Sequence, residues 1–395
     1  MAVFLRFTAD FSGNFLMSSA ATAATTSKGL EGVVAARTTL SDVQGDVGKL
    51  IYGGYDIDEL AGKVSYEEVV YLLHHNHLPN RGELDELKSA LVTYREIPKG
   101  VIDIIKKFPK NTPPMHALRT AVSALGCFDT VADDDTMDAQ RRKARRLIAQ
   151  IPVCVAYAHR ARQKKELIHP DPSLGEAANF LYMINGEKPN EEMVSTMDMC
   201  YVLHADHGMN ASTFSARVTI ATLSDMYSAI TTAIGTLKGP LHGGANEGVI
   251  KMLQEIGSLD KVDAFIEDAL ANKRKIMGIG HRVYKVLDPR APHLQRMAKI
   301  LSAKIGDAKW IQMSERIAQL MLEKKGLNAN VDFYSATVYW SLGIPTDLFT
   351  PIFAIARTSG WTAHVLEQLA DNRLIRPQSL YTGPVGLKVV PIDQR

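Results

Sequence analysis

The chain has 395 residues, enough for two domains with sizeable cores, and its 46% hydrophobic and 22% charged residues are ordinary for a globular protein. A net charge of +2 argues against a nucleic-acid partner, and no apolar run reaches the roughly 18 residues of a membrane span. The cysteines Cys127, Cys154 and Cys200 lie far apart and without CxxC spacing. This pattern argues against a disulfide framework or zinc site and favours a reducing compartment, the cytoplasm.

Residues 1–28 are rich in Ala, Ser and Thr and have no helical or strand period, so we predict a disordered N-terminal tail. Folded structure should begin near Gly29. The segment 29–55 is short, punctuated by glycine and contains β-branched residues, which predicts a small hairpin.

Helical periodicity dominates the rest of the chain. Ser65 and Glu68, and later Asn80 and Glu83, have the spacing of a capping box, which marks two helix starts. Further helical segments are predicted over 113–126, 136–166, 173–186, 191–204, 212–223, 225–238, 245–257, 260–272, 291–304, 307–325 and 346–371. Because no strand-length β-branched runs alternate with them, the sequence predicts an all-α fold rather than a parallel sheet.

Several motifs carry residues suited to proton transfer or to anion binding. Histidine can donate or accept a proton near neutral pH, and arginine forks bind carboxylates well. In chain order the motifs are HADHGMNAS (204–212), GTLKGPLHGGANEG (235–248), KIMGIGHRVYKVLDPR (275–290), NANVDFYSA (328–336), RTSGWTAHVLEQ (357–368) and DNRLIRPQSLYTGP (371–384).

Together and in this order, the motifs resemble those of the citrate synthase family, which includes the 2-methylcitrate synthases. The resemblance covers roughly residues 29–395. It implies a two-domain helical fold, with a large domain over 29–243 and 344–395 and a small inserted helical domain over 244–343. It also implies that acetyl-CoA condenses with oxaloacetate, and that citryl-CoA is then hydrolysed to citrate and coenzyme A.

The resemblance also implies roles for individual residues. The catalytic positions are His242, His281 and Asp332, and the dicarboxylate-binding positions are His207, Arg290, Arg357 and Arg376. The coenzyme A positions are Lys275, Ile276, Met277, Gly278, Ile279 and Lys285. Arg376 matches an arginine that the neighbouring subunit donates, which implies a homodimer with a shared active site. The only coenzyme expected is the coenzyme A thioester substrate, and no metal is expected.

The residue types suit this chemistry independently of the resemblance. Removing the α-hydrogen of a thioester requires a base on one side and a hydrogen bond to the enolate oxygen on the other. Asp332 lies between Val331 and Phe333, whose apolar side chains would raise its basicity by desolvation. His242 and His281 could then serve as the two hydrogen-bond donors, one for each reacting carbonyl.

Each assignment has a plain structural alternative. Asp332 could cap a helix, His207 could be a satisfied core histidine, and Arg290 and Arg376 could be surface turn residues next to proline. We interpret His204 as mainly structural.

Three functional alternatives remain open from the sequence. A metal-dependent hydrolase could use His204, His207, His242 and Asp332, although no HExxH glutamate accompanies the histidines. A helical scaffold without activity is a second alternative. Within the family, propionyl-CoA could replace acetyl-CoA, giving a 2-methylcitrate synthase or an enzyme with both activities; we favour citrate synthase.

Overall fold

The computed structural model describes residues 27–395. The chain divides into two units: residues 38–375 form one, and the terminal segments up to Arg37 and from Arg376 onward form the other. The terminal unit contains the short 3-10 helices η1 Lys28–Leu30 and η4 Ile392–Gln394. The predicted N-terminal tail, residues 1–28, lies outside the described residues except for its last two.

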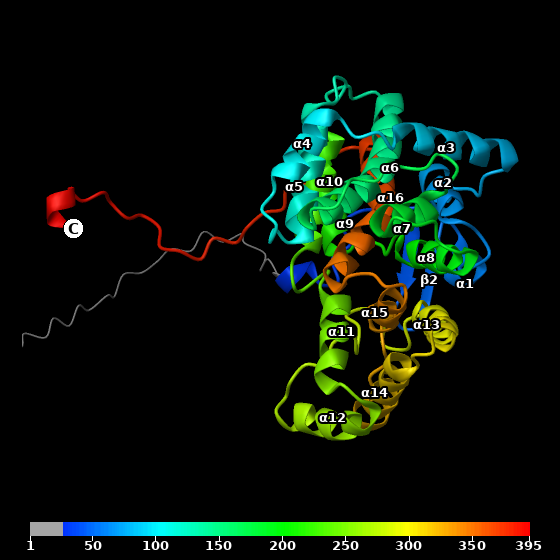
Figure 1. The fold of residues 1–395 in the computed structure, drawn as a ribbon. Helices are drawn as coiled ribbons and strands as arrows, with labels where there is room; N and C mark the ends of the chain where they lie inside the picture. The colour runs from blue at the N-terminus through cyan, green and yellow to red at the C-terminus, as the bar shows by residue number, and fades with distance from the viewer. Residues whose placement is uncertain (1–26) are drawn as a thin grey trace, which may run out of the picture. The chain divides into compact units, whose positions relative to one another are not determined.

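Helices make up most of the regular structure of the unit 38–375, which confirms the predicted all-α fold (Figure 1). The helices of its first half are α1 Ile57–Leu60, α2 Tyr66–His75, α3 Arg81–Tyr94, α4 Lys99–Lys107, α5 Pro114–Cys127, α6 Met137–Arg162, α7 Glu176–Asn185, α8 Glu191–His204, α9 Ala211–Ile220 and α10 Met226–Leu237. The second half contains α11 Ala245–Ile256, η2 Leu259–Lys261, α12 Val262–Ala271, α13 Ala291–Ile305, α14 Lys309–Lys325, α15 Val331–Ser341, η3 Thr346–Leu348 and α16 Phe349–Ala370.

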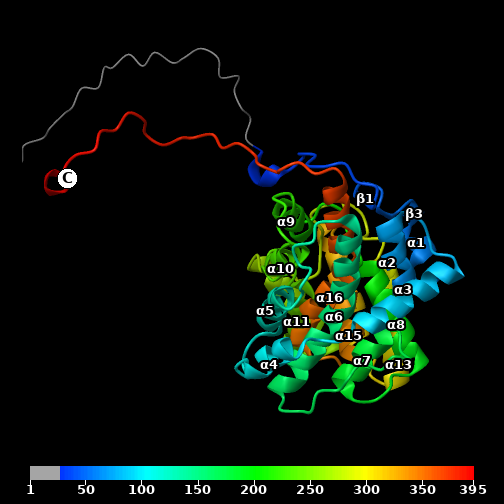
Figure 2. The ribbon, with the colours of Figure 1, turned by 90° about the horizontal axis from the view of Figure 1, so that it is seen from above.

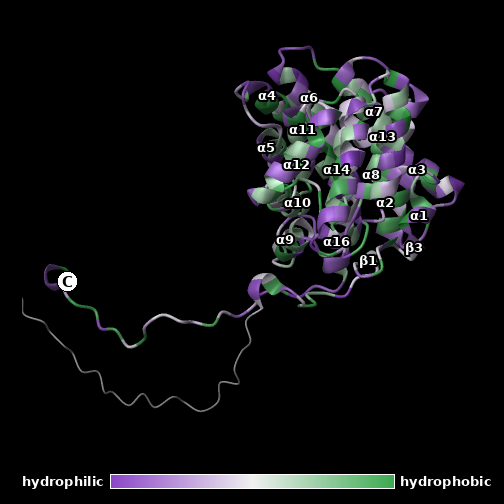
Figure 3. Cartoon of the chain, turned by 90° about the horizontal axis from the view of Figure 1, so that it is seen from below, coloured by the Kyte–Doolittle hydropathy of each residue, from purple (hydrophilic) through white to green (hydrophobic). Residues whose placement is uncertain are grey.

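Both predicted capping boxes are formed. Ser65 precedes α2 and exchanges hydrogen bonds with Glu68, and Asn80 precedes α3 and does the same with Glu83. Each box satisfies N–H groups that the first helical turn leaves without partners. Outer helices such as α3 show hydrophilic residues beside hydrophobic ones in Figure 3, as expected for helices with one buried face.

A small antiparallel sheet precedes the helices. Its strands are β1 Ser41–Gln44, β2 Lys49–Tyr52 and β3 Tyr55–Asp56, with Ser41 opposite Tyr52. The β1–β2 hairpin confirms the prediction for segment 29–55, and β3 is an addition to it. The hairpin turn lies against the loop before α13: Lys285 N donates to Gly45 O at 3.0 Å. A Cβ at Gly45 would lie 2.3 Å from Val283 O, so only glycine fits there.

Helix α16 is the centre of the core. Figure 2 shows it surrounded by other helices, and it packs against α2, α6, α8, α9 and α10. Its side chains are buried on all sides of the helix; Phe349 and Trp361, for example, are fully buried. A helix enclosed in this way has little freedom to move, so the functional residues on it are held in fixed positions.

Helices α11 to α15 gather at one end of the unit, at the bottom of Figure 1. They pack mainly on one another, in the pairs α11–α15, α13–α15 and α12–α14, while α11 also touches α16. These helices fall within the small domain predicted over 244–343, whose boundaries stay a prediction. Helix α15 was not predicted, because its side chains are buried nearly all round and its apolar residues show no helical period. None of the helices within residues 27–395 is both long enough and apolar enough to cross a membrane.

Candidate active site

The predicted site residues of the unit 38–375 come from separate elements. His207 follows α8, His242 lies in the turn between α10 and α11, and His281 lies in the loop after α12. Arg290 is the N-cap residue of α13, Asp332 lies in the first turn of α15, and Arg357 lies in the middle of α16. The fold brings them together: the His207 and His281 rings are 5.4 Å apart, and the charges of Arg290 and Arg357 both act on Asp332.

The protonation of His281 is fixed by its own loop. Its Nδ1 accepts hydrogen bonds from the backbone N–H groups of Val283 and Tyr284, at 3.0 and 3.1 Å. A backbone N–H can only donate, so the neutral ring carries its proton on Nε2. Burial, reinforced by the charge of Arg290, lowers the pKa of His281 to about 4. The ring is therefore neutral at physiological pH and offers an Nε2–H donor.

His242 is fixed in the opposite tautomer. The backbone N–H of Ser212 donates to His242 Nε2 at 3.3 Å, and the Ser212 hydroxyl lies 2.8 Å from the same nitrogen. The proton of the neutral ring is therefore on Nδ1. Burial, followed by the charge of Arg357, lowers the pKa of His242 to about 4. Trp361 Nε1–H donates to the Ser212 hydroxyl at 3.1 Å and holds it in place.

Asp332 does not cap its helix. The N-cap residue of α15 is Asn330, whose side chain accepts from Asp332 N at 3.0 Å, so the capping alternative is wrong. Burial raises the pKa of the Asp332 carboxyl to about 6, although Arg290 acts in the opposite direction. Among the described residues, no donor lies within hydrogen-bond distance of this carboxylate. It is available as a base of raised strength.

The two arginines of the site are buried, and their surroundings differ. Arg290 forms a fork with Asp288, through Nε at 2.9 Å and Nη2 at 2.8 Å, and is only 2% exposed, so it is not a surface turn residue. Arg357 donates Nε–H to His204 O at 2.7 Å, and its guanidinium lies 4.6 Å from the centre of the Phe353 ring. Within residues 27–395, no carboxylate forms an ion pair with Arg357.

Burial lowers the pKa of Arg357 to about 10, so the group is still charged at neutral pH. A buried guanidinium without an ion-pair partner is costly unless an anion joins it. Its Nη1 and Nη2 groups, together with the Arg290 nitrogen that Asp288 leaves free, can bind a carboxylate. The arrangement is therefore suited to a small ligand that carries a carboxylate.

The two histidines of the HADH motif have different surroundings. His207 Nε2 lies 3.2 Å from the Tyr284 hydroxyl, and burial, followed by the charges of Arg290 and Arg357, holds the pKa of His207 well below its usual value. His204 is fully buried and donates Nδ1–H to Cys200 O at 2.7 Å. These contacts agree with our interpretation of His204 as mainly structural.

The loop predicted to bind coenzyme A is tied to the start of α15. Ile279 pairs with Ala329 in an antiparallel bridge, and Asn330 N donates to Gly278 O at 2.9 Å. Gly278 has φ +73°, and a Cβ there would lie 2.6 Å from Val249 Cγ2. Lys275 and Lys285 are exposed, which leaves their charges free for an anionic ligand.

Arg376 is exposed in the terminal unit, and its predicted part in the site stays a prediction. In the described part of the chain, no three His, Cys, Asp or Glu side chains are grouped so that they could hold a metal ion. Sequence reasoning missed Ser212, Trp361, Asp288 and Tyr284, which orient the predicted residues. All four lie inside the quoted motifs, so their place beside the predicted residues was the one feature of the sequence that could have revealed them.

Known proteins are similar to this chain in sequence and in fold. A family model described as the C-terminal domain of citrate synthase matches residues 29–378. Citrate synthase 2 of Bacillus subtilis is 53% identical over 372 residues, which cover 94% of this chain and 100% of that protein. The 2-methylcitrate synthase 1 of Corynebacterium glutamicum is 43% identical over 375 residues, covering 93% and 98%.

A solved structure also matches over nearly the whole chain. It is the ternary complex of carboxymethyl coenzyme A and oxaloacetate with the citrate synthase of Thermoplasma acidophilum. The two folds superpose with a TM-score of 0.89 at 35% identity, covering 94% of this chain and 100% of that one.

Proposed function

The chain belongs to the citrate synthase family, and from this premise we propose that it condenses acetyl-CoA with oxaloacetate and hydrolyses citryl-CoA to citrate and coenzyme A. One observation in the site carries the proposal. A carboxylate with a raised pKa, Asp332, shares the site with two neutral imidazoles of opposite tautomer, His242 and His281, and with two buried guanidiniums. Enolisation followed by carbonyl addition requires one base and two donors.

In the first step Asp332 removes a proton from the methyl group of acetyl-CoA. The electrons of that C–H bond move toward the thioester oxygen, where the Nδ1–H of His242 donates a hydrogen bond. Because His242 is neutral, it stabilises the enolate without giving the site a permanent positive charge.

In the second step the enol carbon attacks the keto carbon of oxaloacetate and forms the new carbon–carbon bond. The keto oxygen gains negative charge, which the Nε2–H of His281 stabilises with a hydrogen bond. One proton, equal to the one that Asp332 removed from the methyl group, then gives the hydroxyl of citryl-CoA. Water then cleaves the thioester to citrate and coenzyme A. We assign no residue of this chain to that hydrolysis.

The proposal assigns the remaining predicted residues to binding. His207, Arg290 and Arg357 hold the carboxylates of oxaloacetate, together with Arg376 of the partner subunit in a homodimer. The backbone of 275–279 and the side chains of Lys275 and Lys285 bind coenzyme A. The proposal includes no metal, no further cofactor, and no nucleic-acid or membrane partner. It also includes a cytoplasmic location, which rests on the separated cysteines.

Activity should depend on the ionisation of Asp332. Since its pKa is raised to about 6, kcat/KM for acetyl-CoA should fall as the pH drops below that value, because a protonated carboxyl cannot accept the substrate proton. The two imidazoles, with pKa values of about 4, should add no further change above pH 5. A pH–rate profile checks this, with circular dichroism at each pH to verify that the chain is folded. A rate that stayed constant well below pH 6 would exclude Asp332 as the base.

The proposed function is tested by the release of the coenzyme A thiol from acyl-CoA. Release should occur with oxaloacetate and be nearly absent without it, and acetyl-CoA should be preferred over propionyl-CoA. The relatives named 2-methylcitrate synthase, at 43% and 42% identity, make propionyl-CoA the specific second candidate. The two substrates differ by one methylene, worth about 1–3 kcal/mol in a pocket, so some activity with both is expected. Release that did not require oxaloacetate would contradict the proposed function.

A further inference from the structure

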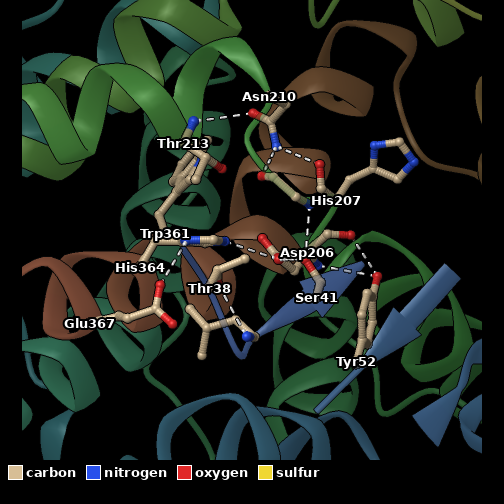
Figure 4. A network of polar contacts seen from close by, with 12 residues as sticks. Thr38, Ser41, Tyr52, Asp206, His207, Asn210, Thr213, Trp361, His364 and Glu367 are labelled. Carbon is tan, nitrogen blue, oxygen red and sulfur yellow. Dashed lines mark hydrogen bonds and ion pairs between the residues drawn. The ribbon is translucent and has the colours of Figure 1, made fainter. Parts of the chain in front are cut away.

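Asp206 is a buried carboxylate that the proposed mechanism does not use, and it directly precedes His207. Its side chain is fully buried. Oδ2 accepts hydrogen bonds from the Ser41 hydroxyl and from His364 Nε2, the latter at 3.1 Å (Figure 4). Among the described residues, no donor reaches Oδ1, so the hydrogen bonds to Oδ2 alone offset the cost of placing an ionised carboxylate in the interior.

His364 can only donate to Asp206. Its Nδ1 lies 3.1 Å from Arg217 Nη1, and a guanidinium has no acceptor, so the Nδ1 lone pair faces Arg217. The ring proton is therefore on Nε2 and points at Asp206. Arg217 is itself held by Glu367 at 2.6 Å and by Gln368 at 3.0 Å. The orientation of the carboxylate is thus determined from α9 and α16 together.

Ser41 connects the two residues that flank His207. Its hydroxyl donates to Asp206 Oδ2 and accepts from the backbone N–H of Gly208 at 2.9 Å. Tyr52 adds a hydrogen bond from its hydroxyl to Asp206 O at 2.7 Å. Ser41 in β1 and Tyr52 in β2 therefore hold the backbone on both sides of His207, although both lie more than a hundred residues before it in the sequence.

The same segment lies along α16. Ser359 Oγ and Gly360 N donate to Ala205 O at 3.3 and 3.1 Å, while Arg357 Nε donates to His204 O at 2.7 Å. Residues 204–207 are thus fixed between the guanidinium of Arg357 and the ring of His364. Any shift of this segment would move His207 relative to Arg357.

We propose that Ser41, Asp206 and His364 form a positioning triad that sets the affinity for oxaloacetate by fixing His207 against Arg357. Among the described residues, no hydrogen bond joins the triad to His242, Asp332 or the loop 275–279. The triad should therefore act on dicarboxylate binding and leave proton removal by Asp332 unchanged. This inference rests on the proposed function.

The test compares Ser41→Ala with Ser41→Thr, which keeps the hydroxyl. Ser41→Ala should weaken oxaloacetate binding roughly 10–100-fold, as when an orienting partner of a functional histidine is lost. Its kcat at saturating oxaloacetate should stay at the wild-type value, and Ser41→Thr should restore the affinity. For each variant, calorimetry measures the affinity for oxaloacetate, and steady-state kinetics measure KM for oxaloacetate and kcat.

Ser314→Ala is the matched control, because both serines are buried, Ser41 with 9% and Ser314 with 0% exposed, and the Ser314 hydroxyl donates to Trp310 O in α14, away from the triad. Equal losses of affinity in Ser41→Ala and Ser314→Ala would overturn the proposal, as would wild-type affinity in Ser41→Ala. If Ser41→Ala does not fold, His364→Gln takes its place with the same expected KM–kcat split. Wild-type protein that neither bound nor consumed oxaloacetate would instead refute the proposed function.

Discussion

Replacing Asp332 with asparagine should lower kcat for condensation by about 10²–10⁴-fold, the usual contribution of a positioned base. Asparagine keeps the shape of the side chain but cannot accept the methyl proton of acetyl-CoA. Oxaloacetate affinity should stay nearly unchanged, because the carboxylate acts on the acyl-CoA. Steady-state kinetics and calorimetric binding of oxaloacetate to the same preparation separate the two effects.

The stability of the same variant is a second readout. The pKa of Asp332 is raised from 3.8 to about 6, so ionisation of this carboxyl disfavours the folded state. That cost is absent below the ordinary pKa and fully present above about 6, so Asp332→Asn should be at least as stable as wild type at neutral pH. Asp85→Asn, the same change on the exposed surface of α3, is the control. A variant that kept more than a tenth of wild-type turnover would require another base.

Two impaired variants should restore activity when they share a dimer. Arg376→Ala alone should weaken oxaloacetate binding by about 2–5 kcal/mol, the loss expected when one member of a desolvated charge pair is removed. A heterodimer of an Arg376→Ala chain and an Asp332→Ala chain should contain one competent site. In that site the Arg376→Ala chain supplies Asp332, and the Asp332→Ala chain supplies Arg376. Chains with two different affinity tags allow the heterodimer to be purified and assayed.

Homodimers of each variant, purified through the same tags, are the controls. They should stay nearly inactive at an oxaloacetate concentration near the wild-type KM. Heterodimers without recovered activity would exclude a site shared between subunits. In that case the dicarboxylate would be bound by residues of the unit 38–375 alone, where Arg290 and Arg357 are buried.

The sequence predicted the fold where local signals are strong. The capping boxes at Ser65 and Asn80 mark the starts of α2 and α3, and both form as predicted. Helix α15 was missed because it is short, 11 residues, and most of its side chains are buried, so no polar face reveals its period; α16 is enclosed too but has 22 residues. The sequence therefore predicts the apolar surroundings of Asp332 correctly, but it does not predict the helix α15 on which Asp332 lies.

Within the site, the sequence could name the residues but not their protonation. The tautomers of His242 and His281 depend on backbone N–H groups of Ser212 and Val283, and such contacts leave no trace in residue identity. Asp206 was likewise overlooked, because its partner Ser41 lies 165 residues away in the chain. Long-range hydrogen bonds of this kind become visible only when the fold is known.

Acetyl-CoA deuterated in its methyl group tests most directly whether the chain joins two carbon atoms by enolisation. The labelled thioester is incubated with oxaloacetate and the purified protein, and the products are identified by mass spectrometry. We predict citrate in which the former methyl carbon has lost one deuteron, since Asp332 removes one hydrogen before the new bond forms. Acetate with its methyl label intact, and no labelled citrate, would show thioester hydrolysis without condensation and would contradict the account.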